Sequence, residues 1–393
     1  MSGNRRPRII IATLFGVLFL ATVDYQLLIP LLPTIGREFG VSMESLGWLF
    51  IGYALAAALF NLFFGPLSDW FGRVIFLRLG LLFFALIALL TYRAASYSHL
   101  FWLRTATGLT AGLLSTCTAS FIGDFFPYER RGRVMGAVLS SYFVALVLGV
   151  PLAAWVAELW NWRTVFFLSS LLALFMLACC FSFFPKEILS SRSPSRQNYF
   201  FVYPQLILRR QTGAALAVSF GVSGGTLAFL TFIPGYLDQA FGLQPVQISW
   251  LFLTAGVAAA IASPLSGWFS DRLGKRKVFL LANTLLVAPL LALDRLAWGI
   301  PLIGLFFLIS LCVAFRQTAL HTLQTELVGI EERGSFLALR NSFSQLGISL
   351  SVFVAGNLYS KLGYGAVTAL AALLTLLSSV VLYQAVEEPT EKK

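Results

Sequence analysis

Two charged residues stand inside long apolar runs of this sequence, where their types and positions could move a proton. Asp24 lies between FLATV and YQLLIP, and Arg104 opens the stretch RTATGLTAG. Apolar surroundings disfavour the charged form of a carboxyl group, whereas a nearby guanidinium favours it. A movement that changes the distance between Asp24 and Arg104 would therefore change how readily the carboxylate takes up a proton. We predict that this pair couples proton uptake to movement; a permanent ion pair and direct substrate contact by Asp24 are the alternatives.

A second arginine, Arg316, also stands deep in an apolar run. It is about ten residues from the predicted end of that run, too far for its head group to snorkel to a membrane surface. We expect Arg316 to face a cavity, where it contacts an anionic substrate or pairs with an acid across the cavity. Three amides are predicted to add polar contacts there: Gln317, Gln26 and Asn61. His321 and Gln324 are interpreted as ordinary helix residues rather than as a proton relay.

One polar pattern interrupts the apolar sequence twice. It reads GPLSDWFGR at residues 65–73 and GWFSDRLGK at residues 267–275, and in each case an acid follows 55 positions after the Asp of the pattern. The base that ends each copy can pair with that acid on a neighbouring helix; a plain glycine turn is the alternative. The residues of this arrangement are Gly65, Asp69, Gly72, Arg73 and Asp124 for the first copy, and Asp271, Gly274, Lys275 and Glu326 for the second.

Helices that cross a membrane must position these residues. The chain has 393 residues, of which 58% are hydrophobic and 11% are charged, whereas a soluble domain carries about 25% charged residues. This composition predicts an all-α integral membrane protein. The apolar runs predict twelve transmembrane helices, at residues 9–31, 46–67, 75–94, 100–123, 134–157, 164–184, 213–235, 247–268, 277–293, 299–325, 335–359 and 364–386.

The basic residues predict the orientation of these helices. Most of the 28 Lys and Arg residues fall in loops on one side of the predicted membrane. This bias places both termini in the cytoplasm, and it accounts for the net charge of +11 without a nucleic-acid partner. The first apolar run lacks a small-residue cleavage site and is interpreted as a retained helix. All four cysteines fall within predicted spans, so neither a disulfide framework nor a metal site is expected.

A constant offset of 202 residues relates the two halves of the chain. It carries Phe39-Gly40 onto Phe241-Gly242 and the first polar loop onto the second. Since 202 residues hold six spans, the halves are predicted to be two six-helix bundles related by a pseudo-twofold axis along the membrane normal. The predicted domains are residues 1–184 and 213–393. They are joined by a polar cytoplasmic linker at residues 185–212, with a short interfacial helix near residues 203–208.

These features resemble the major facilitator superfamily over essentially the whole chain. The loop after the second helix is similar to the family's Gly-x-x-x-Asp-x-x-Gly-Arg motif, and RTATGLTAG is similar to its fourth-helix motif. LGVPLAAWVAELWNWRTVFF, at residues 148–167, resembles the fifth-helix region of the family's drug and sugar exporters. It includes Gly149 and Pro151, but it departs from the antiporter pattern because Val150 separates them and Ala153-Ala154 replace glycines.

The resemblance implies two bundles that rock about a central site. It also implies that the two polar loops and their acids form a latch, which closes the cytoplasmic side. We expect a secondary active transporter that exports a small organic or amphipathic molecule in exchange for protons. Proton symport uptake, translocation of a lipid or lysolipid, and an intramembrane enzyme are the alternatives. No cofactor is expected, and the sequence lacks the Gly-x-x-x-x-Gly-Lys-Ser/Thr loop of an ATP site. The expected protein is a functional monomer in the inner (plasma) membrane of a bacterium, in contact with protons, membrane lipids and its substrate.

Overall fold

A computed structural model describes residues 5–185, 199–329 and 332–388 of the chain, without the side chains of residues 5–6, 63–71, 128–129 and 199–201. Over the described residues all regular elements are helices. The chain divides into two compact units. The first consists of Met1–Val41 with Gly52–Arg196, and the second consists of Ser42–Ile51 with Gln197–Lys393.

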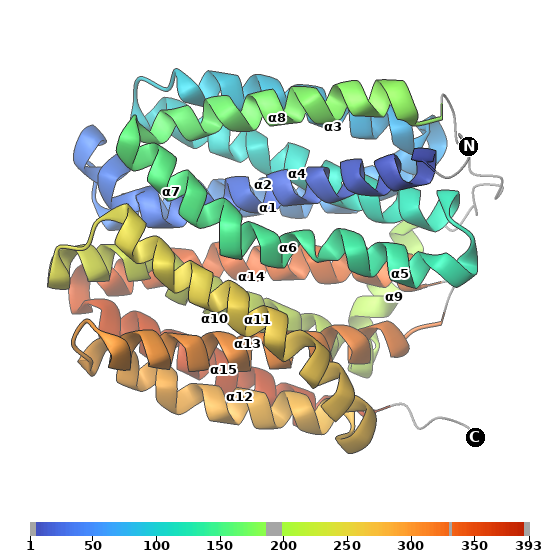
Figure 1. Cartoon of the computed structure of the whole chain (residues 1–393). Helices are drawn as coiled ribbons and strands as arrows, with labels where there is room; N and C mark the ends of the chain where they lie inside the picture. Colours follow the sequence, from blue (N-terminus) through green and yellow to red (C-terminus); the bar gives the residue numbers. More distant parts are fainter. Residues whose placement is uncertain (1–4, 186–198, 330–331, 389–393) are drawn as a thin grey trace. The chain divides into compact units, whose positions relative to one another are not determined.

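The first unit is a bundle whose fifth segment is a broken helix (Figure 1). Its helices are α1 (Arg5–Phe39), most of α2 (Met43–Phe71), α3 (Arg73–Tyr92), α4 (Tyr97–Phe125), α5 (Tyr128–Leu139), α6 (Ser141–Val144), the π-helix η1 (Ala145–Gly149), α7 (Val150–Leu159) and α8 (Trp162–Phe183). Two of these helices have a side-chain cap at their N-terminus. The side chain of Ser96 accepts a hydrogen bond from the backbone amide of His99 at α4, and that of Asn161 accepts one from the backbone amide of Arg163 at α8.

One apolar core holds the first unit together. Leu14 of α1, Leu81 of α3, Phe121 of α4 and Cys180 of α8 lie in this core, each almost wholly buried. In Figure 1, α3 and α8 lie alongside each other. Close packing of these four helices fixes the rotation of α1 and α4, and therefore the direction in which their few charged side chains point.

The second unit contains a short helix followed by six long ones (Figure 1). These are α9 (Tyr199–Leu208), α10 (Arg210–Phe241), α11 (Pro245–Leu273), α12 (Lys275–Ala292) with the 3-10 turn η2 (Leu293–Arg295), α13 (Ile300–Glu326), α14 (Arg333–Leu362) and α15 (Tyr364–Ala385). The first residues of α2 also belong to this unit, where the ring of Trp48 packs edge-on against Phe353. The sequence did not predict this assignment of Ser42–Ile51.

Ten segments of the described chain are long and apolar enough to cross a membrane. All twelve predicted runs lie in helices, but α4 and α14 are not among the ten, because Ser, Thr, Gly and charged residues interrupt their apolar sequence. Several helices are longer than predicted. Helix α1 continues through Pro30 and Pro33 to Phe39, as membrane helices tolerate proline where neighbouring groups satisfy the freed carbonyls. The full twelve-span topology stays a prediction.

Candidate functional site

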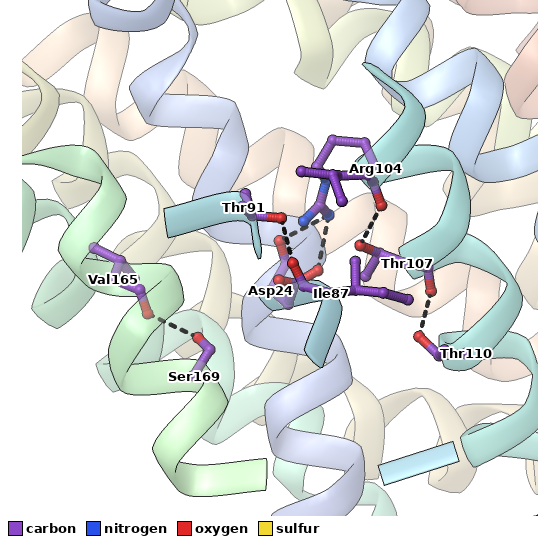
Figure 2. Close-up of polar contacts among 9 residues, drawn as sticks. Asp24, Ile87, Thr91, Arg104, Thr107, Thr110, Val165 and Ser169 are labelled. Atoms are coloured by element: carbon purple, nitrogen blue, oxygen red, sulfur yellow. Dashed lines mark hydrogen bonds and ion pairs between the residues drawn. The ribbon is translucent and has the colours of Figure 1, made fainter. Parts of the chain in front are cut away.

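Asp24 and Arg104 form a buried ion pair in the first unit (Figure 2). Nη2 of Arg104 lies 2.8 Å from Oδ2 of Asp24 and also donates to the Asp24 backbone carbonyl at 3.3 Å. Each side chain has only 2% of its surface exposed. Helix α1 supplies the acid and α4 supplies the base, so the pair that the sequence predicted joins the helices at one point.

Aromatic rings and hydroxyl groups surround this pair. The guanidinium of Arg104 lies 5.7 Å from the ring centre of Tyr53 and 5.6 Å from that of Phe166, within range of a cation–π attraction. Four nearby hydroxyls donate to carbonyls of their own helices in Figure 2: those of Thr91, Thr107, Thr110 and Ser169. These hydroxyl protons are therefore used within their own helices, and among the described residues the ion pair of Asp24 is with Arg104.

The exporter-like stretch of the sequence lies against α1 one residue before Asp24. A Cβ placed on Gly149 would stand 2.3 Å from Cγ2 of Val23, far inside contact distance. Gly149 ends the π-helix η1, and Pro151 follows in α7. A widened π turn relieves the clash that a proline ring makes with the carbonyl four residues earlier. This stretch therefore acts through its small size at Gly149, which lets α1 pack closely against it at the level of the ion pair.

The structure contains both ion pairs of the predicted latch. Nε of Arg73 lies 2.6 Å from Oδ2 of Asp124 in the first unit. In the second unit, Nζ of Lys275 lies 2.8 Å from Oε2 of Glu326. The preceding glycines adopt matching backbones, with φ of 96° at Gly72 and 93° at Gly274, a conformation that favours glycine.

The surroundings of the remaining latch residues are described only in the second copy. The side chains of Gly65 and Asp69 lie outside the described residues. In the second copy, Asp271 is exposed on α11. A feature that the sequence did not predict completes this copy: the carboxylate of Glu388 accepts the backbone amide of Lys275 at 2.7 Å. A carboxylate at the start of α12 is favoured by the helix dipole.

Arg316 lies in a buried cage of neutral acceptors. From α13 its Nη1 atom donates to Asn283 Oδ1 at 3.0 Å and to Thr375 Oγ1 at 3.2 Å. Its Nη2 atom donates to Thr226 Oγ1 at 2.5 Å and to the Val222 carbonyl at 3.4 Å. Only 1% of the residue is exposed. These partners come from α10, α12 and α15, so in this structure Arg316 links four helices of the second unit.

The three amides predicted beside Arg316 do not form one cluster with it. Gln26 and Asn61 are buried in the first unit, where Asn61 Oδ1 accepts the hydroxyl of Thr116 at 3.3 Å. Gln317 is half-buried on α13 in the second unit. Whether these residues contact a substrate stays a prediction.

Two arrangements escaped the sequence analysis. Thr226, which accepts from Arg316, lies 202 residues after Asp24, so the repeat offset could have found it. Arg340 lies in α14, where its Nη1 atom contacts Nδ1 of His321 on α13. Its position within the helix predicted at residues 335–359 is the sequence feature that could have identified this contact.

A family model described as Major Facilitator Superfamily matches residues 14–244 and 215–393 of the chain. The chain belongs to the major facilitator superfamily. Members of this superfamily are membrane transporters of small molecules, so the protein is a multi-pass integral membrane protein with a transport function.

Known relatives of this superfamily member extend over nearly all of its length. The uncharacterized MFS-type transporter YceJ of Bacillus subtilis (strain 168) is 26% identical, over 96% of each chain. Multidrug resistance protein MdtG of Klebsiella pneumoniae (strain 342) is 24% identical, over 92% of this chain and 90% of the relative.

The solved structures include a bacterial homolog to the human lysosomal transporter Spinster, in an inward-facing and unoccupied conformation. It matches with a TM-score of 0.78 at 14% identity, over 99% of this chain and 100% of that one. This likeness shows that the superfamily member has the fold of the family.

Proposed function

We propose that this protein exports a small organic molecule in exchange for protons, by alternating access of a central site to the two sides of the membrane. The observation that carries the proposal is the buried pair of Asp24 and Arg104, whose atoms lie 2.8 Å apart. An acid within a membrane-spanning helix is costly, and such residues usually serve transport. The multidrug resistance proteins among the relatives favour export.

The pair supplies a two-state element of the kind that coupling requires. While Asp24 is ionised, its carboxylate binds Arg104 and holds α1 against α4. A proton on Asp24 removes the negative charge, so Arg104 loses its ionic partner, while the rings of Tyr53 and Phe166 and the backbone carbonyl of Asp24 remain beside it. The helices can then shift, and the change in surroundings favours release of the proton on the other side.

The proposal also covers the arrangement of the whole chain around the pair of Asp24 and Arg104. We take the protein to be a monomer in a bacterial inner membrane, with twelve spans, cytoplasmic termini and the domain limits given by the sequence. The two latch pairs support a matching role for both halves, because Arg73–Asp124 and Lys275–Glu326 recur at one offset.

Transport by the purified protein in liposomes tests the proposal. A pH gradient is imposed, and uptake of four probes is followed: ethidium, glucose, benzoate and lysophosphatidylcholine. We expect at least one probe to accumulate against its gradient with the wild type and none with Asp24→Asn. Glu158→Gln is the matched control, because it makes the same change at an exposed carboxylate. Gradient-driven accumulation by Asp24→Asn would place the coupling site elsewhere.

Binding measurements provide a second readout of the same proposal. Proton and substrate binding are linked, so each must shift the other by an equal free energy. We expect the transported probe to release protons into weakly buffered solution when it binds the wild type. Asp24→Asn should bind the probe without releasing protons. Equal release by both proteins would contradict coupling at Asp24.

A further inference from the structure

The two units provide different partners for the arginines that lie away from the ends of their helices. Arg104 in the first unit has a carboxylate partner. In the second unit the described partners of Arg316 and Arg340 are all neutral side chains or carbonyls. Among the described residues, these two positive charges within long helices of the second unit have no acid bound to them.

Of these two arginines, Arg340 is the one within reach of a ligand. Arg316 is 1% exposed and already uses four hydrogen bonds. Arg340 is partly exposed, and its partner His321 is exposed. Its Nη2 atom donates to Oδ1 of Asn341 at 2.8 Å, while Nη1 contacts Nδ1 of His321. Since the guanidinium is a donor only, His321 must accept through Nδ1 and carry its proton on Nε2.

The exposed side of this cluster differs from the apolar side of α13. Leu308 is exposed on α13 and is typical of a surface that meets lipid. Gln317 follows nine residues later, which is two and a half turns at 3.6 residues per turn, so it faces the opposite way. His321 lies one turn beyond Gln317. A polar face that carries an arginine contact inside a membrane is expected to meet water or a ligand and not lipid.

We propose that Arg340, His321 and Asn341 hold the anionic group of the transported substrate, with Gln317 at the edge of the site. The ligand class is an organic anion that carries a carboxylate, sulfonate or phosphate group. A guanidinium binds such a group through two parallel N–H bonds, and the Nε2 proton of His321 supplies a third donor. This inference rests on the proposed transport function and adds the charge of its substrate.

The charge of the site can be measured without knowing the substrate. Gln317→Cys is made in a Cys179→Ser background, because Cys179 is half-buried and the other three cysteines are buried. The new thiol is reacted with two methanethiosulfonates of similar size, the anionic sulfonatoethyl and the cationic trimethylammonioethyl reagents. After correction for their rates with a free thiol, we expect the anionic reagent to react roughly tenfold faster, as a positive charge within a few ångströms would cause.

Variants of Arg340 decide whether this preference comes from the proposed site. Arg340→Gln should remove it and Arg340→Lys should keep it. Arg333→Gln, which removes a charge at an exposed position two turns earlier on α14, should leave it unchanged. If Gln317→Cys folds poorly by gel filtration, Asn341→Cys replaces it as the reporter.

Protection experiments then identify the source of the anion. We expect benzoate to slow the modification of Cys at position 317, whereas benzylammonium should not slow it. Protection by lysophosphatidylglycerol but not by benzoate would identify a lipid headgroup as the anion. A reagent preference that Arg340→Gln does not change would overturn the proposal. That result would leave the liposome test of Asp24 unaffected, so the two proposals fail separately.

Discussion

Nε of Arg73 lies 2.6 Å from Oδ2 of Asp124. The same contact recurs 202 residues later between Lys275 and Glu326 at 2.8 Å. A base at the start of one helix thus binds an acid at the end of the helix beside it, once in each unit. Both pairs are partly exposed, so they add little to the stability of a bundle, and their value is expected to lie in the transport cycle.

Replacing Arg73 with Ala should slow transport severalfold and change the free energy of unfolding by about 1 kcal/mol or less, since the pair is partly exposed. Initial rates in liposomes and thermal unfolding in detergent measure the two effects. Lys275→Ala is the matched variant, and we expect it to have the smaller effect on rate because the second copy departs from the family motif. If neither variant changes the rate, the repeated loop is only a turn.

The buried pair of Asp24 and Arg104 should show strong coupling in a double-mutant cycle. Arg104→Gln leaves a carboxylate buried without its ionic partner, which is expected to cost about 3–5 kcal/mol of stability. The double variant with Asp24→Asn should be more stable than Arg104→Gln alone. Chemical unfolding in detergent checks this order. Additive effects of the two changes would mean that the contact contributes nothing specific.

Gly149 should be needed for the approach of α1. Gly149→Ala places a Cβ 2.3 Å from Cγ2 of Val23, and overpacking of this kind costs about 1–3 kcal/mol. Val23→Ala removes that atom, so the double variant should recover both stability and transport. Gly136→Ala on α5 is the control, because its Cβ would meet nothing within 4 Å. An unchanged unfolding midpoint for Gly149→Ala would show that the helices can move apart freely.

One variant can show whether the role of Arg316 is to stabilise the fold or to bind substrate. Arg316→Met leaves the acceptor atom of Asn283 and the hydroxyl of Thr226 without their donor, and each such loss costs about 1–3 kcal/mol. We expect a lower unfolding midpoint with the affinity for a transported probe unchanged. The reverse result, lost affinity with normal stability, would support the direct anion contact that the sequence predicted.

The sequence could predict which residues pair where the pairing depends on how far each residue lies along its helix. Asp24 and Arg104 could be paired because each lies a countable number of residues from the end of its apolar run. The latch pairs followed from an offset that holds without a gap. Rotation about the helix axis was harder to predict. Nothing in the residues around Arg316 indicated that its side chain points to Asn283 and Thr375 on α12 and α15.

The other features that the sequence did not predict depend on the local backbone, on the reach of long side chains and on packing between distant residues. The π turn at Ala145–Gly149 has an ordinary apolar sequence, and only the following Pro151 hints at it. Arg340 lies near the start of its predicted helix, and this position did not indicate that its side chain contacts a residue of α13. The assignment of Ser42–Ile51 to the second unit depends on packing between residues far apart in the chain.

In the proposed proton exchange, the threonine at position 226 would limit how far the substrate is concentrated, because the repeat would place a second Asp24 there. A threonine hydroxyl does not bind and release protons near neutral pH, so the second unit has no counterpart of Asp24 at this position. With one proton exchanged for each molecule moved and no membrane voltage, a difference of one pH unit sustains at most about a tenfold concentration ratio. A steeper ratio would require either a larger pH difference or the voltage across the membrane.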